Sequence, residues 1–305
     1  MDLDGDLHAL VCGDGRVRRF RAGRSSSAAN AVESARLTLR RLAYECADAD
    51  RMLARLTTLG ARLEAVLLGP AARHLGDGPV VVVPTGGLHG VPWALLPALA
   101  DRPHAVAPSA SAWLNSLAVP AGSGEVLVRG PGLATLGAEV PVLTRMYPSA
   151  RVLEDGSATA SAVLDSLNGT ALAHIAAHGT FRADNPLFSA LALDDGPLTV
   201  YDFERLGRAP HRLVLPSCGS GRLLPVGADE LLGLTAALLP LGTAGIVASL
   251  VPVNDPATVP LMVSLHEALR AGATCADALH RARRATCADP VRQATALSFV
   301  ALGAA

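Results

Sequence analysis

The sequence predicts an α/β protein with a mostly parallel central sheet and helices on both faces. From residue 125 onward, short apolar runs alternate with segments whose apolar residues recur at helical spacing. The run VVVVP at residues 80–84 is wholly apolar and β-branched, a pattern typical of parallel strands that are covered on both faces. With 305 residues, of which 50% are hydrophobic, the chain can bury a large core.

Residues 1–120 are predicted to form a lobe of their own. Its expected elements are a β-hairpin, a helical hairpin that is broken at Gly60, and two short strands, at residues 7–21, 28–76, 80–84 and 104–108. The segment PAGSG at 120–124 has the composition of a linker. We therefore place a domain boundary there.

Residues 121–305 are predicted to form a second, larger lobe. The expected strands are 125–130, 150–155, 172–179, 211–218, 245–253 and 296–303, and the expected helices are 138–147, 159–168, 229–239, 257–272 and 274–286. Strands that alternate with helices imply right-handed crossovers and a parallel sheet. In such a sheet, functional residues lie just past the carboxyl ends of the strands.

Charge and hydropathy exclude several classes of protein. The net charge is −1 and no basic block is present, so we expect neither nucleic acid nor an anionic membrane as a partner. The acidic start MDLDGDLHAL is not a signal peptide. Residues 231–253 carry no charge, but Pro240, Gly242 and Gly245 divide them into a helix, a loop and a strand rather than a membrane span.

The cysteines favour a reducing compartment. There are five, an odd number, and they are scattered without a CxxC pair, so neither a disulfide framework nor a zinc site is indicated. We expect a cytoplasmic protein with no metal and no organic cofactor.

Two predicted strands end in a reactive side chain next to glycine. LAHIAAHG ends in His178 and Gly179, and HRLVLPSC ends in Cys218, which Gly219 follows. An imidazole near a thiol can take its proton, which makes the sulfur a nucleophile. The N–H groups of Gly179 and Cys218 are candidate donors to an oxyanion, since glycine lets a substrate approach the backbone closely. A lone histidine or cysteine at a strand end usually only fills space in the packing. The two together, each next to glycine, predict a Cys–His pair.

A second motif suggests a different chemistry. EVLVRGPGLATLGAE at 125–139 reads as a strand, a glycine-rich loop and a helix, and Glu154–Asp155 ends the next strand. This order imitates a dinucleotide-binding fingerprint, but the last glycine comes two residues late and Pro131 stiffens the loop. An ordinary turn between strand and helix is the simpler interpretation. We likewise give His89, within TGGLHGVPW, a structural interpretation: its side chain hydrogen-bonds the backbone of a tight turn.

Three acidic residues lie in segments that follow predicted strands. Asp229 and Glu230 precede an apolar helix and Asp255 precedes another, so helix capping explains all three. The alternative is a role in substrate binding for Asp255 and Asp229, in which Asp255 selects a basic side chain.

The chain resembles the CHAT family of caspase-like cysteine peptidases, relatives of caspases and separase. The resemblance follows the order of five blocks, which are VVVVPTGGLHGVPWALL, HIAAHGTFRADNPLFSALAL, LVLPSCGSG, GADELLGLTAALLPLGTAGIVASLVPVNDPAT and LSFVALG. It implies a caspase-like α/β sandwich preceded by a pseudo-protease-like lobe. It also assigns His178 as the catalytic histidine, Gly179 as the oxyanion glycine and Cys218 as the nucleophile. Pro216-Ser217 stands where relatives usually have alanine before the cysteine, and Val251 stands where tryptophan is common.

The resemblance implies a cysteine endopeptidase that cleaves a partner protein in a regulated bacterial signalling, defence or cell-death pathway, with a regulatory protein as a further partner. Two other functions stay open. The fold could serve as a catalytically silent scaffold for protein binding, or the GPGLATLG loop could bind a nucleotide in an oxidoreductase.

Overall fold

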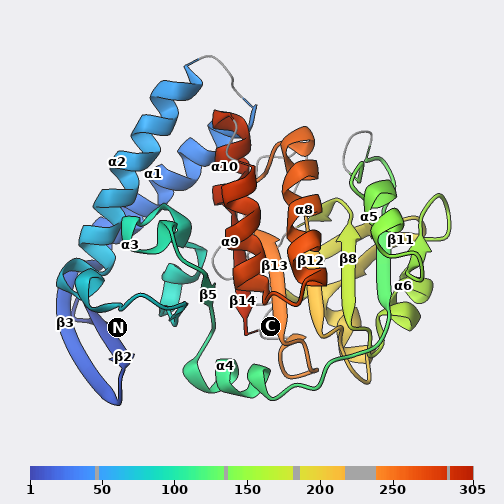
Figure 1. Cartoon of the computed structure of the whole chain (residues 1–305), viewed down its shortest axis with the longest axis horizontal. Helices are drawn as coiled ribbons and strands as arrows, with labels where there is room; N and C mark the ends of the chain where they lie inside the picture. Colours follow the sequence, from blue (N-terminus) through green and yellow to red (C-terminus); the bar gives the residue numbers. More distant parts are fainter. Residues whose placement is uncertain (45–47, 134–136, 181–185, 217–237, 287–288, 305) are drawn as a thin grey trace.

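The computed structural model describes residues 1–44, 48–133, 137–180, 186–216, 238–286 and 289–304. Its main feature is an eight-stranded sheet with the order β4-β5-β14-β13-β12-β8-β6-β7 (Figure 1). The strands are β4 (Val80–Val82), β5 (His104–Val106), β6 (Glu125–Arg129), β7 (Arg151–Leu153), β8 (Leu172–Ala176), β12 (Arg212–Leu215), β13 (Gly245–Ser249) and β14 (Phe299–Gly303). Its neighbouring strands are parallel except for β13 and β14, so a mostly parallel sheet is confirmed.

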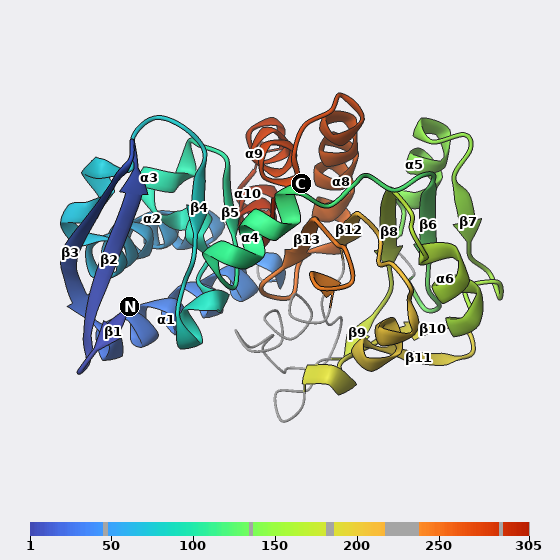
Figure 2. The ribbon, with the colours of Figure 1, turned by 90° about the horizontal axis from the view of Figure 1, so that it is seen from below.

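Side chains along the central strands alternate between two cores. On β14, Phe299 and Ala301 belong to one apolar cluster, whereas Val300 and Leu302 belong to the other. This alternation follows from the two-residue period of a strand. Helices α5 (Val140–Met146), α8 (Asp255–Arg270) and α9 (Cys275–Ala285) cover the first face, and α6 (Ala160–Leu167) covers the second (Figure 2). The prediction of helices on both faces is confirmed.

The chain begins with a small antiparallel sheet and two long helices. Strands β1 (Asp2–Leu3), β2 (Asp6–Gly13) and β3 (Arg16–Arg24) contain the predicted hairpin, and α1 (Ser25–Tyr44) and α2 (Ala49–Leu67) form the predicted helical hairpin. The predicted break at Gly60 is wrong, because Gly60 lies inside α2. A Cβ atom there would overlap the carbonyl oxygen of Leu95. The glycine therefore marks a close approach between two segments rather than the end of a helix.

Gly60→Ala is expected to destabilise the protein although alanine favours helices. The substitution gains about 1 kcal/mol in helix propensity. The added methyl must displace the Leu95 backbone, and overpacking of this kind costs about 1–3 kcal/mol. Urea unfolding would measure the difference, with Thr57→Ala on the exposed face of α2 as the control. A Gly60→Ala protein more stable than the wild type would contradict the packing argument.

Several elements differ from the sequence predictions or were not foreseen. Strand β4 is an edge strand with half-buried valines, not a strand covered on both faces. The predicted strand at 296–303 begins only at Phe299 and is preceded by a helix. The unforeseen elements are β9 (Gly179–Thr180), β10 (Ala190–Leu193) and β11 (Gly196–Thr199), which form a second small sheet, and α10 (Pro290–Ser298). The remaining short helices are α3 (Pro97–Ala100), α4 (Ala110–Leu117) and the 3-10 turns Gly69–His74, Gly86–Gly90, Trp93–Leu95, Pro186–Phe188 and Val200–Arg205.

The two predicted lobes share one sheet. Strands β4 and β5 precede the proposed boundary at residue 120, yet β5 pairs with β14 near the end of the chain. The division into residues 1–120 and 121–305 remains a prediction. Among the described residues, none of the helices combines the length and apolar character that crossing a bilayer requires.

Candidate active site

His178 lies just past the carboxyl end of β8, and a backbone carbonyl holds its ring. The Nε2 atom of the half-buried His178 is 3.2 Å from the carbonyl oxygen of Gly132, in the segment after β6. A carbonyl oxygen only accepts, so Nε2 carries the hydrogen and donates it. In a neutral imidazole the other nitrogen, Nδ1, then carries the basic lone pair. The contact with Gly132 thus selects the tautomer of His178.

The backbone around His178 is fixed by close packing of three segments. The N–H of Gly130 donates to the carbonyl of Ala176 at 2.8 Å, and the N–H of Ala192 on β10 donates to the carbonyl of His178 at 2.8 Å. A Cβ atom on Gly130 would lie only 2.6 Å from the carbonyl oxygen of Ala192, so a side chain there would push β10 away. Gly130 therefore permits the approach that holds the His178 backbone.

Gly179 follows in β9, and its N–H points away from the neighbouring strand. Gly179 stands opposite Leu191 in the antiparallel β9–β10 pair. Because the Ala192 N–H donates to the His178 carbonyl, His178 and Ala192 are a hydrogen-bonded pair of the antiparallel ladder. Such pairs alternate with non-hydrogen-bonded ones, so the N–H groups of the next pair, Gly179 and Leu191, point away from the partner strand. The β9–β10 ladder thus leaves this donor unused, which is what an oxyanion donor requires.

Cys218 lies outside the described residues, but the strand that leads to it is well placed. Strand β12 is the parallel neighbour of β8, with Arg212 opposite Leu172 and Val214 opposite His174. This offset of 40 residues is also the separation between His178 and Cys218. Strand β12 ends at Leu215, and Pro216 is the last described residue before the cysteine. Asp229 and Glu230 likewise fall outside the described residues.

Asp255 opens α8, beyond the same edge of the sheet. Strands β12 and β13 are parallel, so the segment after β13 begins at the edge where His178 lies. The preceding Asn254 caps α8: its side chain accepts from the Ala257 N–H at 3.0 Å and donates to the Ala43 carbonyl of α1 at 2.9 Å. An acidic residue in the first turn also favours the helix. Asp255 therefore has a structural role that needs no substrate.

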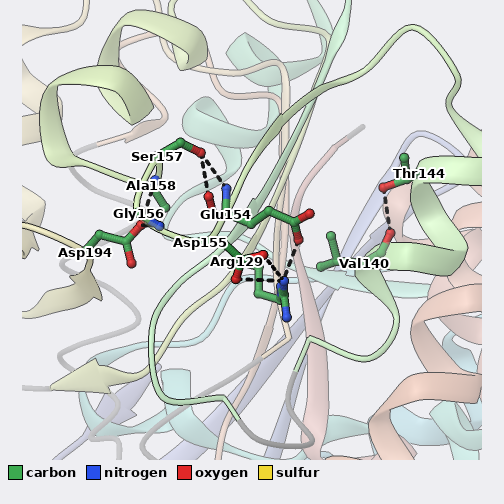
Figure 3. Close-up of polar contacts among 9 residues, drawn as sticks. All are labelled: Arg129, Val140, Thr144, Glu154, Asp155, Gly156, Ser157, Ala158 and Asp194. Carbon is green, nitrogen blue, oxygen red and sulfur yellow. Dashed lines mark hydrogen bonds and ion pairs between the residues drawn. The ribbon is translucent and has the colours of Figure 1, made fainter.

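The acidic pair of the dinucleotide alternative is occupied by an arginine. Arg129 Nε lies 2.9 Å from Glu154, and Arg129 Nη2 lies 2.9 Å from Asp155 (Figure 3). A dinucleotide ribose would need one of these carboxylates as its acceptor. The loop carbonyl of Gly132 is in turn bound to His178. The geometry favours the ordinary-turn interpretation. Nor does the described part of the chain bring three His, Cys, Asp or Glu side chains together as metal ligands.

His89 is a buried histidine in a tight turn, as interpreted from the sequence. Its Nδ1 atom is 2.8 Å from the Gly86 carbonyl within the 3-10 turn after β4. Five strand spacings separate β4 from β8 in the sheet, or about 24 Å at ~4.8 Å per spacing. His89 is therefore far from His178.

Sequence reasoning missed a chain of four buried polar side chains under α5 and α8. His174 of β8 lies 3.3 Å from Glu139 through Nε2 and 3.0 Å from His266 of α8 through Nδ1. His266 Nδ1 lies 3.1 Å from the hydroxyl of Tyr147. The four residues come from three segments, the two ends of α5, strand β8 and helix α8, and Glu139 and His266 are 127 positions apart in the sequence. No local motif joins them.

The direction of each hydrogen bond in this network follows from its last member. The Tyr147 hydroxyl donates to the His266 carbonyl, so His266 Nδ1 must donate to Tyr147. Burial holds the pKa of His266 well below its usual value, and the nearby His174 adds to this effect, so His266 is neutral. Its Nε2 then accepts from His174. His174 Nδ1 is therefore the donor to His266, and its Nε2 faces the Glu139 carboxyl group.

The fold and the histidine at the edge of its sheet define a caspase-like α/β protein. The chain belongs to the CHAT domain family, which matches residues 55–299. Two structures of the Saccharomyces cerevisiae separase–securin complex resemble it, with TM-scores of 0.50 and 0.52 at 15% and 14% identity. They cover 71% and 73% of this chain, which spans only 15% of the separase chain.

A complex of the pro- and mature domains of Porphyromonas gingivalis RgpB matches 93% of this chain and 77% of its own, with 11% identity and a TM-score of 0.48. No curated protein matches the chain.

Proposed function

We propose that this protein is a cysteine endopeptidase in which Cys218 is the nucleophile and His178 the general base and acid. The observation that carries the proposal is the His178–Gly132 contact at the carboxyl edge of β8, on the strand next to the one that leads to Cys218. The contact keeps the hydrogen of neutral His178 on Nε2 and leaves the basic lone pair on Nδ1. A neighbouring thiol needs such a basic nitrogen to take its proton.

In the proposed reaction, His178 Nδ1 takes the proton of the Cys218 thiol. The sulfur attacks the scissile carbonyl, and the resulting oxyanion accepts from the N–H groups of Gly179 and Cys218. His178 then delivers the proton to the departing amine, which leaves an acyl-enzyme. Water, deprotonated by His178, attacks the thioester and releases the acid with a regenerated thiol. No metal or organic cofactor takes part in these steps.

A protein is the substrate class that best fits the family. Separase in the similar structures is bound to another protein, securin, which supports regulation by a protein partner in this chain as well. We place the reaction in a regulated signalling, defence or cell-death pathway in the cytoplasm. Asp255 and Asp229 are proposed to contact the substrate near the cut, with Asp255 favouring a basic side chain.

The alternative is a catalytically silent scaffold that acts by binding proteins. The sequence Pro216-Ser217 before Cys218 favours it, because proline restricts the backbone that would present the nucleophile. Only an activated thiol distinguishes the peptidase from the scaffold.

The proposal is tested by labelling with a peptide that carries a thiol-reactive group after an arginine. Rapid modification of Cys218, located by mass spectrometry, is expected in the wild type and is expected to be lost in His178→Ala. Cys12 is exposed and reports ordinary thiol reactivity, whereas burial raises the pKa of Cys275 to about 12 and makes it a negative control. Cys218 labelling no faster than that of Cys12 would support the scaffold. A leucine in place of the arginine tests Asp255, whose Asp255→Asn variant should label equally with both peptides.

A further inference from the structure

A cavity of about 490 Å³ lies at the edge of the sheet opposite His178. Its floor includes Glu125, Leu172 and Arg212, the first residues of β6, β8 and β12, and its wall comes from the ends of α5 and α8. The strands are parallel, so the cavity lies at their amino ends, whereas His178 lies beyond the carboxyl end of β8. The six residue-to-residue steps from Leu172 to His178 span about 20 Å in an extended chain. The cavity is a separate site from the candidate active site.

Two arginines line this cavity, and the described part of the chain gives neither of them a carboxylate partner. Arg212 and Arg270 make no ion pair within the part of the chain that the structure describes, and the Nε atom of Arg212 is buried without a hydrogen-bond partner. The Arg270 guanidinium lies over the ring of Tyr147, 5.5 Å from its centre. Guanidinium groups that no carboxylate in the described residues engages are suited to bind a ligand oxygen.

The charge at the cavity is positive on balance. Burial lowers the pKa of the adjacent His211, and the charges of Arg212 and Arg208 lower it further. The His211 Nδ1 atom is also buried without a partner. Glu125 is a carboxylate among the described lining residues, but no ion pair joins it to either arginine of the cavity. A ligand with negative charge would therefore be favoured here.

We propose that this cavity binds a small organic oxyanion, a phosphate ester or a carboxylate, through Arg212 and Arg270. The planar guanidinium presents paired donors that match both kinds of anion. The apolar part of the ligand lies against Leu172 and Leu269, which line the same cavity. This site is independent of the proposed peptidase activity.

Calorimetric titration with phenyl phosphate and with benzoate, at constant ionic strength, tests the proposal. The wild type is expected to bind at least one of the two saturably, and which one binds identifies the anion. Arg212→Gln and Arg270→Gln should each weaken binding about tenfold or more, because each removes charged hydrogen bonds. Arg62→Gln, on the exposed face of α2, is the matched control and should bind like the wild type.

Folding effects are separated by two further measurements. Arg270 is exposed, so Arg270→Gln should keep the wild-type circular dichroism spectrum. Arg212→Lys keeps the charge but loses the paired donors, and it should weaken binding less than Arg212→Gln does. The proposal is overturned by a wild type that binds neither compound, or by folded Arg212→Lys and Arg270→Gln proteins that bind as tightly as the wild type. Neither result would bear on labelling of Cys218.

Discussion

Cys218→Ala is expected to lower kcat/KM for a cleavable peptide by about 10³-fold or more, and His178→Ala should have an effect of the same order. In the proposed mechanism the sulfur forms the covalent bond and the imidazole moves the proton, so neither works without the other. For the same reason the double variant should be little slower than either single variant, because the two residues act as a unit. Rates would be measured with a peptide taken from a substrate library.

The matched control is His89→Gln. Like His178, His89 follows a strand and is next to a glycine. Its Nδ1 contacts a backbone carbonyl, as His178 Nε2 does. It lies several strands away in the sheet. Its substitution should leave kcat/KM within about twofold of the wild type. A Cys218→Ala protein that cleaves at the wild-type rate would exclude the proposed mechanism.

Glu139→Ala is expected to destabilise the protein by about 1–3 kcal/mol, because it leaves a buried polar group without its partner. Glu139 and His174 are 1% and 0% exposed, and Glu139 Oε1 lies 3.3 Å from His174 Nε2. With the carboxyl removed, the buried His174 Nε2 loses its contact with Glu139. Urea unfolding followed by circular dichroism would measure the loss.

Two comparisons make this result specific to the network. Glu267→Ala, at an exposed position of α8, should change stability by less than about 0.5 kcal/mol. A double-mutant cycle of Glu139→Ala with His174→Ala should show a coupling of about 1–3 kcal/mol, since each residue is the other's partner. If Glu139→Ala unfolds at the same urea concentration as the wild type, the buried hydrogen bonds contribute nothing to stability.

The sequence predicted the class of sheet because the central strands, such as β8 and β13, are short apolar runs that are buried throughout. The strands β6, β8, β12 and β13 all appear within the expected ranges. The small sheet β9–β11 was not foreseen, because its two-residue and four-residue strands lack a period long enough to recognise. Gly60 was misread for a related reason: its cause is the distant Leu95 backbone, and local spacing cannot show a tertiary contact.

The candidate site shows the same limit. The positions of His178 and Gly179 at a strand end follow from local pattern, whereas the Gly132 carbonyl that orients the ring comes from 46 residues earlier in the chain. The network of Glu139, His174, His266 and Tyr147 was invisible for this reason as well, since each residue alone resembles an ordinary core or helix position.

The placement of β14 has a consequence for synthesis on the ribosome. Strands β4 and β5 emerge early, but β14 is the strand that pairs β5 with β13. The two halves of the sheet can therefore join only after residue 303 has left the exit tunnel. A nascent chain that already holds His178 and Cys218 still lacks the strand that joins the two halves of the sheet, so the sheet is completed only after β14 has emerged.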